Sequence, residues 1–214
     1  MKLKGVKFGI YHSWRDFSLI LGDKTIGAAE AKTAEVEVPG ADGVLDITEY
    51  FGDINYKNRS LQFVFSTIVP QKEFLKLFSK IQNAIHGKKI RIILDDDPDF
   101  YYVGRVTVSE WKANKNVGEL TIDCDCEPYK YKMYETMITE EISGTKEIVL
   151  NNLRRRVNPV ITTSAQMNIL FNDTSYMLSA GTWTIPEIYL VAGKNHLTVS
   201  GNGTIEFKYQ EGGL

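Results

Sequence analysis

The segment 119–128 constrains the fold more than any other part of this 214-residue sequence. Its small or apolar residues alternate with acidic or hydroxyl residues, so that one face would carry Leu120, Ile122, Cys124, Cys126 and Pro128 and the other Glu119, Thr121, Asp123, Asp125 and Glu127. A period of two is that of a β-strand, whose successive side chains point to opposite faces. The segment is therefore predicted to be a strand with one buried and one solvated face.

Similar alternation predicts strands at 61–66 and 100–108, and a hairpin turn at 113–116 precedes the strand at 119–128. Helical spacing occurs in one place. After Pro70, apolar residues recur at intervals of three and four, namely Phe74, Leu75, Leu77, Phe78, Ile81, Ala84 and Ile85. Gly87 stands where a helix C-cap is expected. We predict one amphipathic helix at about 71–86, with its apolar stripe on a sheet, and no other helix.

The sequence pattern changes after a polar region at 133–144 that is rich in threonine and glutamate. Short strands cut by Asn-Asp, Gly-Lys-Asn and Gly-Asn-Gly turns are predicted at 161–165, 167–171, 176–179, 182–189, 196–200 and 204–209. Strands at this spacing without helices favour a small β-sandwich. We place a domain boundary near residue 132, which divides the chain into domains 1–132 and 133–214.

Composition and charge exclude several classes of protein. With 43% hydrophobic and 24% charged residues the chain has the composition of a soluble globular protein. A net charge of −2 argues against a general nucleic-acid binder, which needs a basic footprint. No segment approaches the roughly 20 apolar residues of a membrane-spanning helix, and we expect no cleaved secretory signal. Cys124 and Cys126 are too close in sequence to staple distant segments, which favours synthesis in a reducing cytoplasm.

Residues able to carry chemistry are present, but no catalytic motif joins them. His12, His86 and His196 are predicted to be ordinary surface or loop side chains, and the two cysteines to lie in the core. The acidic cluster at 95–99 could bind calcium or act as an acid/base pair, although a solvated turn is favoured. Phosphate could be bound by Arg154, Arg155 and Arg156, although a solvated loop is the favoured interpretation of this segment. We predict no enzyme activity, no metal and no cofactor.

Aromatic side chains leave a second kind of function open. Trp14, Trp111, Trp183, Tyr101 and Tyr102 could stack on sugars, although in a β-rich protein most such residues belong to a core or an interface.

Several ordered segments resemble one family. Gly-Val-Leu-Asp-Ile-Thr-Glu at 43–49, followed by Gly52 and by Tyr-Lys-Asn-Arg at 56–59, is similar to the N-terminal signature of distal tail proteins. These are the tail-tip hub proteins of long-tailed, non-contractile bacteriophages and of prophages of Gram-positive bacteria. The resemblance continues through the helix, the segments 87–97, 100–106 and 126–131, and the C-terminal pieces at 185–186, 193–201 and 209–214. The chain is compact for the family, so inserted carbohydrate-binding modules and long receptor-binding arms are not expected.

The resemblance implies a mainly β fold. The N-terminal ring-forming domain would be a β-sandwich with one amphipathic α-helix and a β-hairpin extension, and the C-terminal domain a galectin-like β-sandwich on the outside of the ring. Six copies would form a hub at the distal end of the tail tube in the virion, after assembly in the cytoplasm of the bacterial host. The implied partners are the major tail (tube) protein, the tail-associated fibre or lysin protein, and the tape-measure protein.

The solvated face of the strand at 119–128 supplies the candidate site. Glu119, Asp123, Asp125 and Glu127 would lie along it, with alternate residues roughly 7 Å apart. If they line the lumen of the ring they would repel DNA phosphates; the alternative is an ordinary outer face. Two other functions compete with the hub: a carbohydrate-binding module that uses Trp183 or Tyr189, and an enzyme that uses the acidic turn at 95–99.

Overall fold

The computed structural model describes residues 4–50, 52–67, 69–113 and 117–214. The chain forms two compact units, Met1–Lys130 and Tyr131–Gly213, and each is described by itself. Both consist mainly of β-strands, as the alternating patterns predict. The roles expected for domains 1–132 and 133–214, ring formation and a galectin-like sandwich, stay predictions.

One antiparallel sheet organises the first unit. In spatial order its strands are β2 (Tyr11–His12), β1 (Val6–Phe8), β7 (Lys89–Leu94), β8 (Asp97–Ala113), β9 (Gly118–Cys126), β6 (Arg59–Thr67) and β3 (Leu19–Ile26). β9 pairs with β6 from Arg59↔Cys126 to Thr67↔Gly118, which confirms the strand predicted from the alternation. The turn predicted at 113–116 falls largely outside the described residues, but Ala113 and Gly118 pair on either side of it.

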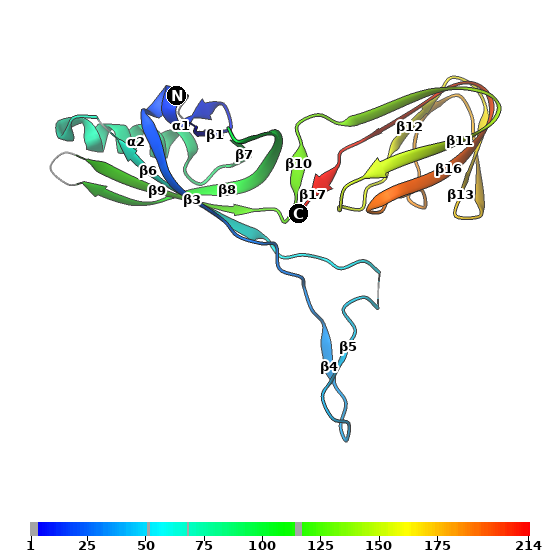
Figure 1. Ribbon diagram of the computed structural model, residues 1–214, viewed down its shortest axis with the longest axis horizontal. Coiled ribbons are helices and arrows are strands. Elements are labelled where there is room, and N and C mark those ends of the chain that lie inside the picture. The colour runs from blue at the N-terminus through cyan, green and yellow to red at the C-terminus, as the bar shows by residue number, and fades with distance from the viewer. Residues whose placement is uncertain (1–3, 51, 68, 114–116) are drawn as a thin grey trace. The chain divides into compact units, whose positions relative to one another are not determined.

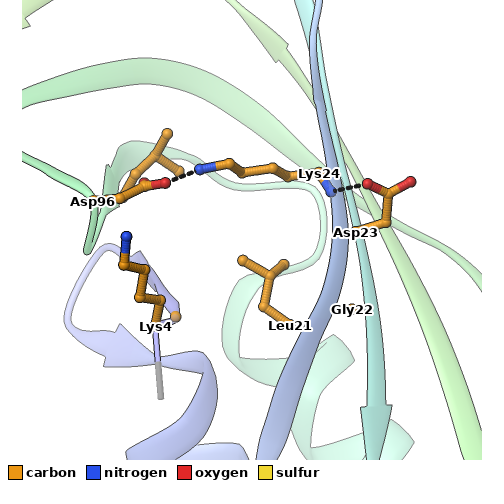
Figure 2. A pocket seen from close by; sticks show the side chains of 8 residues that line it. Lys4, Leu21, Gly22, Asp23, Lys24 and Asp96 are labelled. Carbon is orange, nitrogen blue, oxygen red and sulfur yellow. Dashed lines mark hydrogen bonds and ion pairs between the residues drawn. The ribbon is translucent and has the colours of Figure 1, made fainter. Parts of the chain in front are cut away.

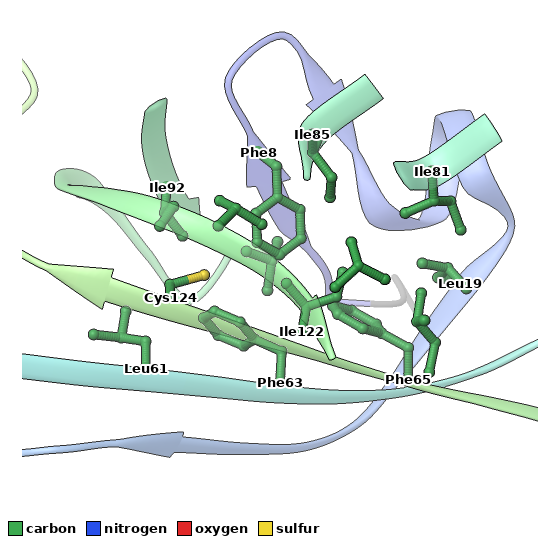
Figure 3. Packing of buried hydrophobic residues seen from close by; sticks show 14 of the residues in the cluster. Phe8, Leu19, Leu61, Phe63, Phe65, Ile81, Ile85, Ile92, Ile122 and Cys124 are labelled. Atoms are coloured by element: carbon green, nitrogen blue, oxygen red, sulfur yellow. The ribbon is translucent and has the colours of Figure 1, made fainter. Parts of the chain in front are cut away.

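The buried face of β6 and β9 packs beneath a helix and strand β1 (Figure 3). The helix α2 (Phe74–Ile85) follows a single 3₁₀ turn, η1 (Gln71–Glu73), and confirms the predicted amphipathic helix. Its Ile81 and Ile85 are fully buried. Phe8 of β1 meets Phe63 of β6 edge to face, with 5.7 Å between the ring centroids. This is a favourable geometry for aromatic pairs.

A second helix, α1 (Ser13–Phe17), contradicts the prediction of a single helix. Its five residues are too few to show a helical repeat, and His12 caps its N-terminus. The Nδ1 atom of His12 accepts hydrogen bonds from the backbone N–H groups of Trp14 and Arg15, and the backbone N–H of His12 donates to Asp16 at 2.6 Å. His12 is only 5% exposed, so the prediction of a surface or loop histidine is wrong for this residue. Its backbone-capping role accounts for its burial.

A long hairpin leaves the sheet between β3 and β6, and we call its residues 27–58 the arm (Figure 1). At its base the N–H of Gly27 donates to the carbonyl of Ser60, and Ala31 forms a bridge with Tyr56. Further out, β4 (Glu35–Glu37) pairs with β5 (Val44–Asp46). A β-hairpin extension is thus present, as the family resemblance implies.

The second unit is built around the long strand β16 (Gly193–Tyr209). The equally long β11 (Thr136–Asn152) pairs with it over its whole length. The remaining strands are β12 (Val160–Thr163), β13 (Met167–Phe171), β14 (Thr174–Leu178) and β15 (Gly181–Thr184), in the sheet order β14-β13-β16-β12-β15. Two short strands, β10 (Lys130–Lys132) and β17 (Gly212–Gly213), pair with each other. The core of this unit includes Leu197, Val199, Ile205 and Phe207 of β16.

The structure corrects several predicted turns and strands in this unit. The strands at 196–200 and 204–209 are one strand, and the Gly-Asn-Gly turn between them is wrong. Gly201 and Gly203 instead have φ of 151° and 137° inside β16, and a Cβ on Gly203 would lie 2.6 Å from Ser164 Oγ. These glycines permit an unusual backbone and a close approach rather than a chain reversal. Gly193–Asn195 likewise begins β16 instead of forming a turn. The strand predicted at 182–189 is confined to β15. Part of the polar region 133–144, for which no strand is predicted, belongs to β11.

The Asn-Asp turn is confirmed. Asn172 and Asp173 both have positive φ, 46° and 61°, and join β13 to β14 next to the pair Phe171↔Thr174. Two central residues with positive φ are the pattern of a type I′ hairpin, for which asparagine and aspartate are favoured.

Replacement of Gly104 by alanine tests the packing between β8 and β9. A Cβ on Gly104 would meet the Sγ atom of Cys126 and lie 2.7 Å from the carbonyl oxygen of Asp125, so either side chain or backbone must move. We expect Gly104→Ala to lower the free energy of unfolding by about 1–3 kcal/mol, as overpacking does. The measurement is urea unfolding followed by tryptophan fluorescence. Gly22→Ala is the matched control, because its nearest contact is Val64 O at an ordinary 3.5 Å; equal effects of the two substitutions would contradict the packing argument.

Candidate assembly surfaces

The predicted acidic row lies on the solvated face of the first unit's sheet, in which β9 runs between β6 and β8. Glu119 and Asp125 are exposed, while Asp123 and Glu127 are half-buried, and Glu127 follows the last residue of β9. Register places cations beside two of the four: Lys112 of β8 opposite Glu119, and Arg105 opposite Asp125.

Hydrogen bonds hold the acidic side chains in place. Gln62 donates to Asp123 at 2.8 Å, and Ser109 donates to the other oxygen of the same carboxylate. Asn58 donates to Asp125 at 3.1 Å.

Glu127 has a charged partner, since Lys89 Nζ lies 2.6 Å from its Oε1 atom. The row is therefore an ordered, partly compensated set of carboxylates in which Asp123 accepts from the neutral side chains of Gln62 and Ser109.

The carboxylates of the acidic cluster at 95–99 contact different segments of the chain. Asp95 and Asp96 form the turn between β7 and β8. Asp95 accepts from the backbone N–H of Gly5 at 2.9 Å and lies 3.0 Å from His12 Nε2, whereas Asp97 pairs with Lys130 at 2.7 Å. The cluster thus ties the turn to its surroundings, in line with the favoured turn interpretation.

A shallow hollow lies beside this turn (Figure 2). Lys24 of β3 spans it to form an ion pair with Asp96, and hydrogen bonding to Lys24 lowers the pKa of the Asp96 carboxyl. Lys4 and the apolar Leu21 and Leu94 complete much of the lining. Its volume of about 230 Å³ is below the roughly 300–1,000 Å³ of pockets that enclose a small-molecule ligand.

Other candidates from the sequence have structural roles. Cys124 and Cys126 are free thiols in the core, as predicted, and burial raises the pKa of both, that of Cys126 to about 12. The guanidinium groups of Arg155 and Arg156 lie over the rings of Tyr131 and Tyr189, at 5.5 Å and 3.3 Å from the ring centroids. Within the described ranges, no group of three or more His, Cys, Asp or Glu side chains is placed to hold a metal ion.

The aromatic candidates separate into buried and exposed residues. Trp111 packs on Phe74 and Phe78 of the helix α2, and Tyr101 and Tyr102 are buried. Trp183 differs, because it is 39% exposed on β15, at the edge of its sheet, where its Nε1–H donates to Ser179 O at 3.0 Å.

The arm is a functional candidate that the sequence reasoning did not single out. Every residue of β4 and β5 is exposed. Register pairs Glu35 with Asp46, Val36 with Leu45 and Glu37 with Val44, so one face of the ribbon carries three carboxylates and the other carries apolar side chains. A count of charges would have revealed it, since residues 27–58 contain seven acidic and two basic side chains.

The structure is thus a mainly β chain with two compact units, and its first unit carries an ordered acidic row and an exposed hairpin arm. Among the described residues, no helix combines the length and apolar character needed to cross a membrane.

Comparison with known proteins adds a fold likeness. Neither a protein-family model nor a curated protein matches the sequence. The crystal structure of the SPP1 Dit (gp 19.1) protein matches with a TM-score of 0.68 at 14% identity, covering 98% of this chain and 99% of that chain. That protein is described as a paradigm of the hub adsorption apparatus in phages that infect Gram-positive bacteria. The chain thus shares the fold of the SPP1 Dit protein along nearly its whole length.

Proposed function

We propose that the chain is a structural, non-enzymatic phage tail protein that forms a hub ring at the distal end of the tail tube. The observation that carries the proposal is the fold likeness to the SPP1 Dit protein over nearly the full length of both chains. A likeness confined to one unit would fit an accessory domain equally well, because common folds serve many functions. Coverage of both units and of the arm between β3 and β6 supports the hub.

In this proposal each part of the chain has a place in the virion. The first unit forms a ring of six copies, and its exposed arm contacts another copy. The second unit, with its expected galectin-like sandwich, lies outside the ring. The ring joins the major tail (tube) protein to the tail-associated fibre or lysin protein, and the tape-measure protein reaches its centre.

Ring formation is the direct test. A cyclic assembly uses a heterologous interface, in which one patch meets a different patch on the next copy and the ring closes. We expect the purified chain to elute as a species of about six subunits in light scattering and to appear as rings in negative-stain micrographs. A protein that stays monomeric at the highest attainable concentration would argue strongly against the hub.

The acidic row gives the ring a proposed lumen. Glu119, Asp123, Asp125 and Glu127 would face the passing genome and repel its phosphates, which keeps DNA from adhering. Asp123→Asn together with Asp125→Asn removes two charges and keeps most of the shape. In phage particles that carry both substitutions we expect slower or incomplete DNA ejection, measured by fluorescence of the released genome. Unchanged ejection kinetics, in rings that map these residues to the outer wall, would refute the lumen assignment and leave the hub intact.

The exposed Trp183 supports one alternative, a carbohydrate-binding module that recognises host cell-wall sugars. An edge-strand tryptophan with 39% exposure could stack on a sugar ring. That function predicts saturable quenching of tryptophan fluorescence by cell-wall glycans, and loss of the response in Trp183→Ala but not in Trp14→Ala. Quenching that survives Trp183→Ala, or none in the wild type, would set the alternative aside.

A further inference from the structure

The arm carries a net negative charge, whereas the rest of its unit carries a net positive charge. Residues 27–58 carry a net charge of −5, whereas residues 1–26 and 59–130 together contain sixteen basic and twelve acidic side chains, a net of +4. Lys32 and Lys57 are the arm's two cations, and Lys57 is paired with Glu30 at 3.2 Å. Most of the arm's negative charge therefore has no basic side chain within the arm to balance it.

The outer ribbon of the arm is poorly stabilised by itself. Glu35 and Asp46 are direct cross-strand partners, and like charges placed opposite one another destabilise a sheet. Glu37 lies on the same face, two residues along β4. All side chains of both strands are exposed, and an isolated two-stranded hairpin is marginal in water. The acidic face therefore fits a partner that supplies cations in a row.

The outward side of η1 and α2 presents such a row. Lys72, Lys76 and Lys80 recur every four residues and are exposed, and Glu73 is the one acidic side chain in these two elements. Residues four apart in an α-helix, such as Lys76 and Lys80, are separated by about 6 Å along its axis, close to the roughly 6.7 Å between alternate residues of a strand. Lys72 precedes α2 in the 3₁₀ turn η1, which rises by about 2 Å per residue and so places Lys72 slightly farther from Lys76. The lysines thus match the spacing of Glu35 and Glu37. Leu75, 74% exposed beside them, could meet Val44 of the same acidic face, which is 52% exposed.

The two surfaces lie at opposite ends of a strand within one copy. The arm returns to the sheet at Arg59, the first residue of β6, whereas η1 follows Thr67, the last. Nine residues of strand separate these points by roughly 26 Å. A second copy of the chain is therefore the natural source of the lysine row.

We propose that the acidic face of the arm docks on the lysine row of η1 and α2 in a neighbouring copy, with Glu35 and Glu37 opposite Lys72 of η1 and Lys76 of α2. This inference rests on the proposed ring and adds the pair of surfaces that joins its subunits. Asp46 and Lys80 flank the contact. Both have other roles, since the Asp46 carboxylate accepts from the N–H of Thr48 and Lys80 donates to Asp16 O.

A charge-swap experiment tests the pairing. Glu35→Lys with Glu37→Lys reverses the arm, and Lys72→Glu with Lys76→Glu reverses the helix, while Asp46 and Lys80 are left intact. We expect each pair of substitutions to weaken ring assembly at least tenfold, measured by sedimentation velocity over a concentration series. The four substitutions together should restore assembly, and wild-type assembly should weaken as sodium chloride is raised, because exposed charges are screened.

The controls separate folding from docking. Circular dichroism and the thermal midpoint should show that every variant keeps the wild-type fold, and Lys194→Glu, an exposed lysine of the second unit, should leave assembly unchanged. Folded single-surface variants that assemble like the wild type would overturn the inference and leave the hub standing. Loss of assembly that the four-fold variant does not rescue would also overturn it, since another partner would then occupy the arm or the helix. A wild-type chain that stays monomeric would overturn both the inference and the hub.

Discussion

Burial of one face of β6 and β9 is the constraint on which the rest of the first unit depends. Phe63, Phe65 and Ile122 need an apolar cover, and strand β1 and the helix α2 provide it. Because side chains alternate along a strand, this burial fixes the register and turns Gln62, Asp123 and their neighbours to the other face. The acidic row is a consequence of the core: the same pattern that hides the aromatic rings sets the carboxylates on a solvated surface.

Periodicity predicted those elements that bury one side of a regular segment. The strand at 119–128 and the helix at about 71–86 are examples, since each repeats its apolar residues often enough to show a period. The helix α1 could not be found this way, because its five residues are held by the His12 cap and by burial against the sheet. The continuity of β16 was missed because Gly201 and Gly203 suggest a turn, whereas pairing with β11, some sixty residues earlier, keeps the chain extended.

The candidate site was predictable in its outline only. Alternation alone placed Glu119, Asp123 and Asp125 on one face. Their partners come from other strands: Gln62 and Asn58 lie at or beside β6, and Ser109 lies on β8. Such contacts depend on tertiary register, which a local pattern does not contain. The same holds for the cluster at 95–99, because three consecutive aspartates pair with His12, Lys24 and Lys130, which lie in different segments.

The outer strands of the arm differ from the strands of the sheet because neither of their faces packs on a core. In β6 and β9 the exposed polar and charged side chains alternate with buried ones, so the core on the opposite face stabilises these strands. In the arm neither face of β4 and β5 is buried, and Glu35 and Asp46 repel each other across the ladder. Any partner that contributes cations relieves this repulsion and covers apolar surface, and so binds the ordered hairpin in preference to a frayed one. In the proposed ring, order in the arm is thereby coupled to contact with a neighbouring copy, which supplies the stability that the isolated hairpin lacks.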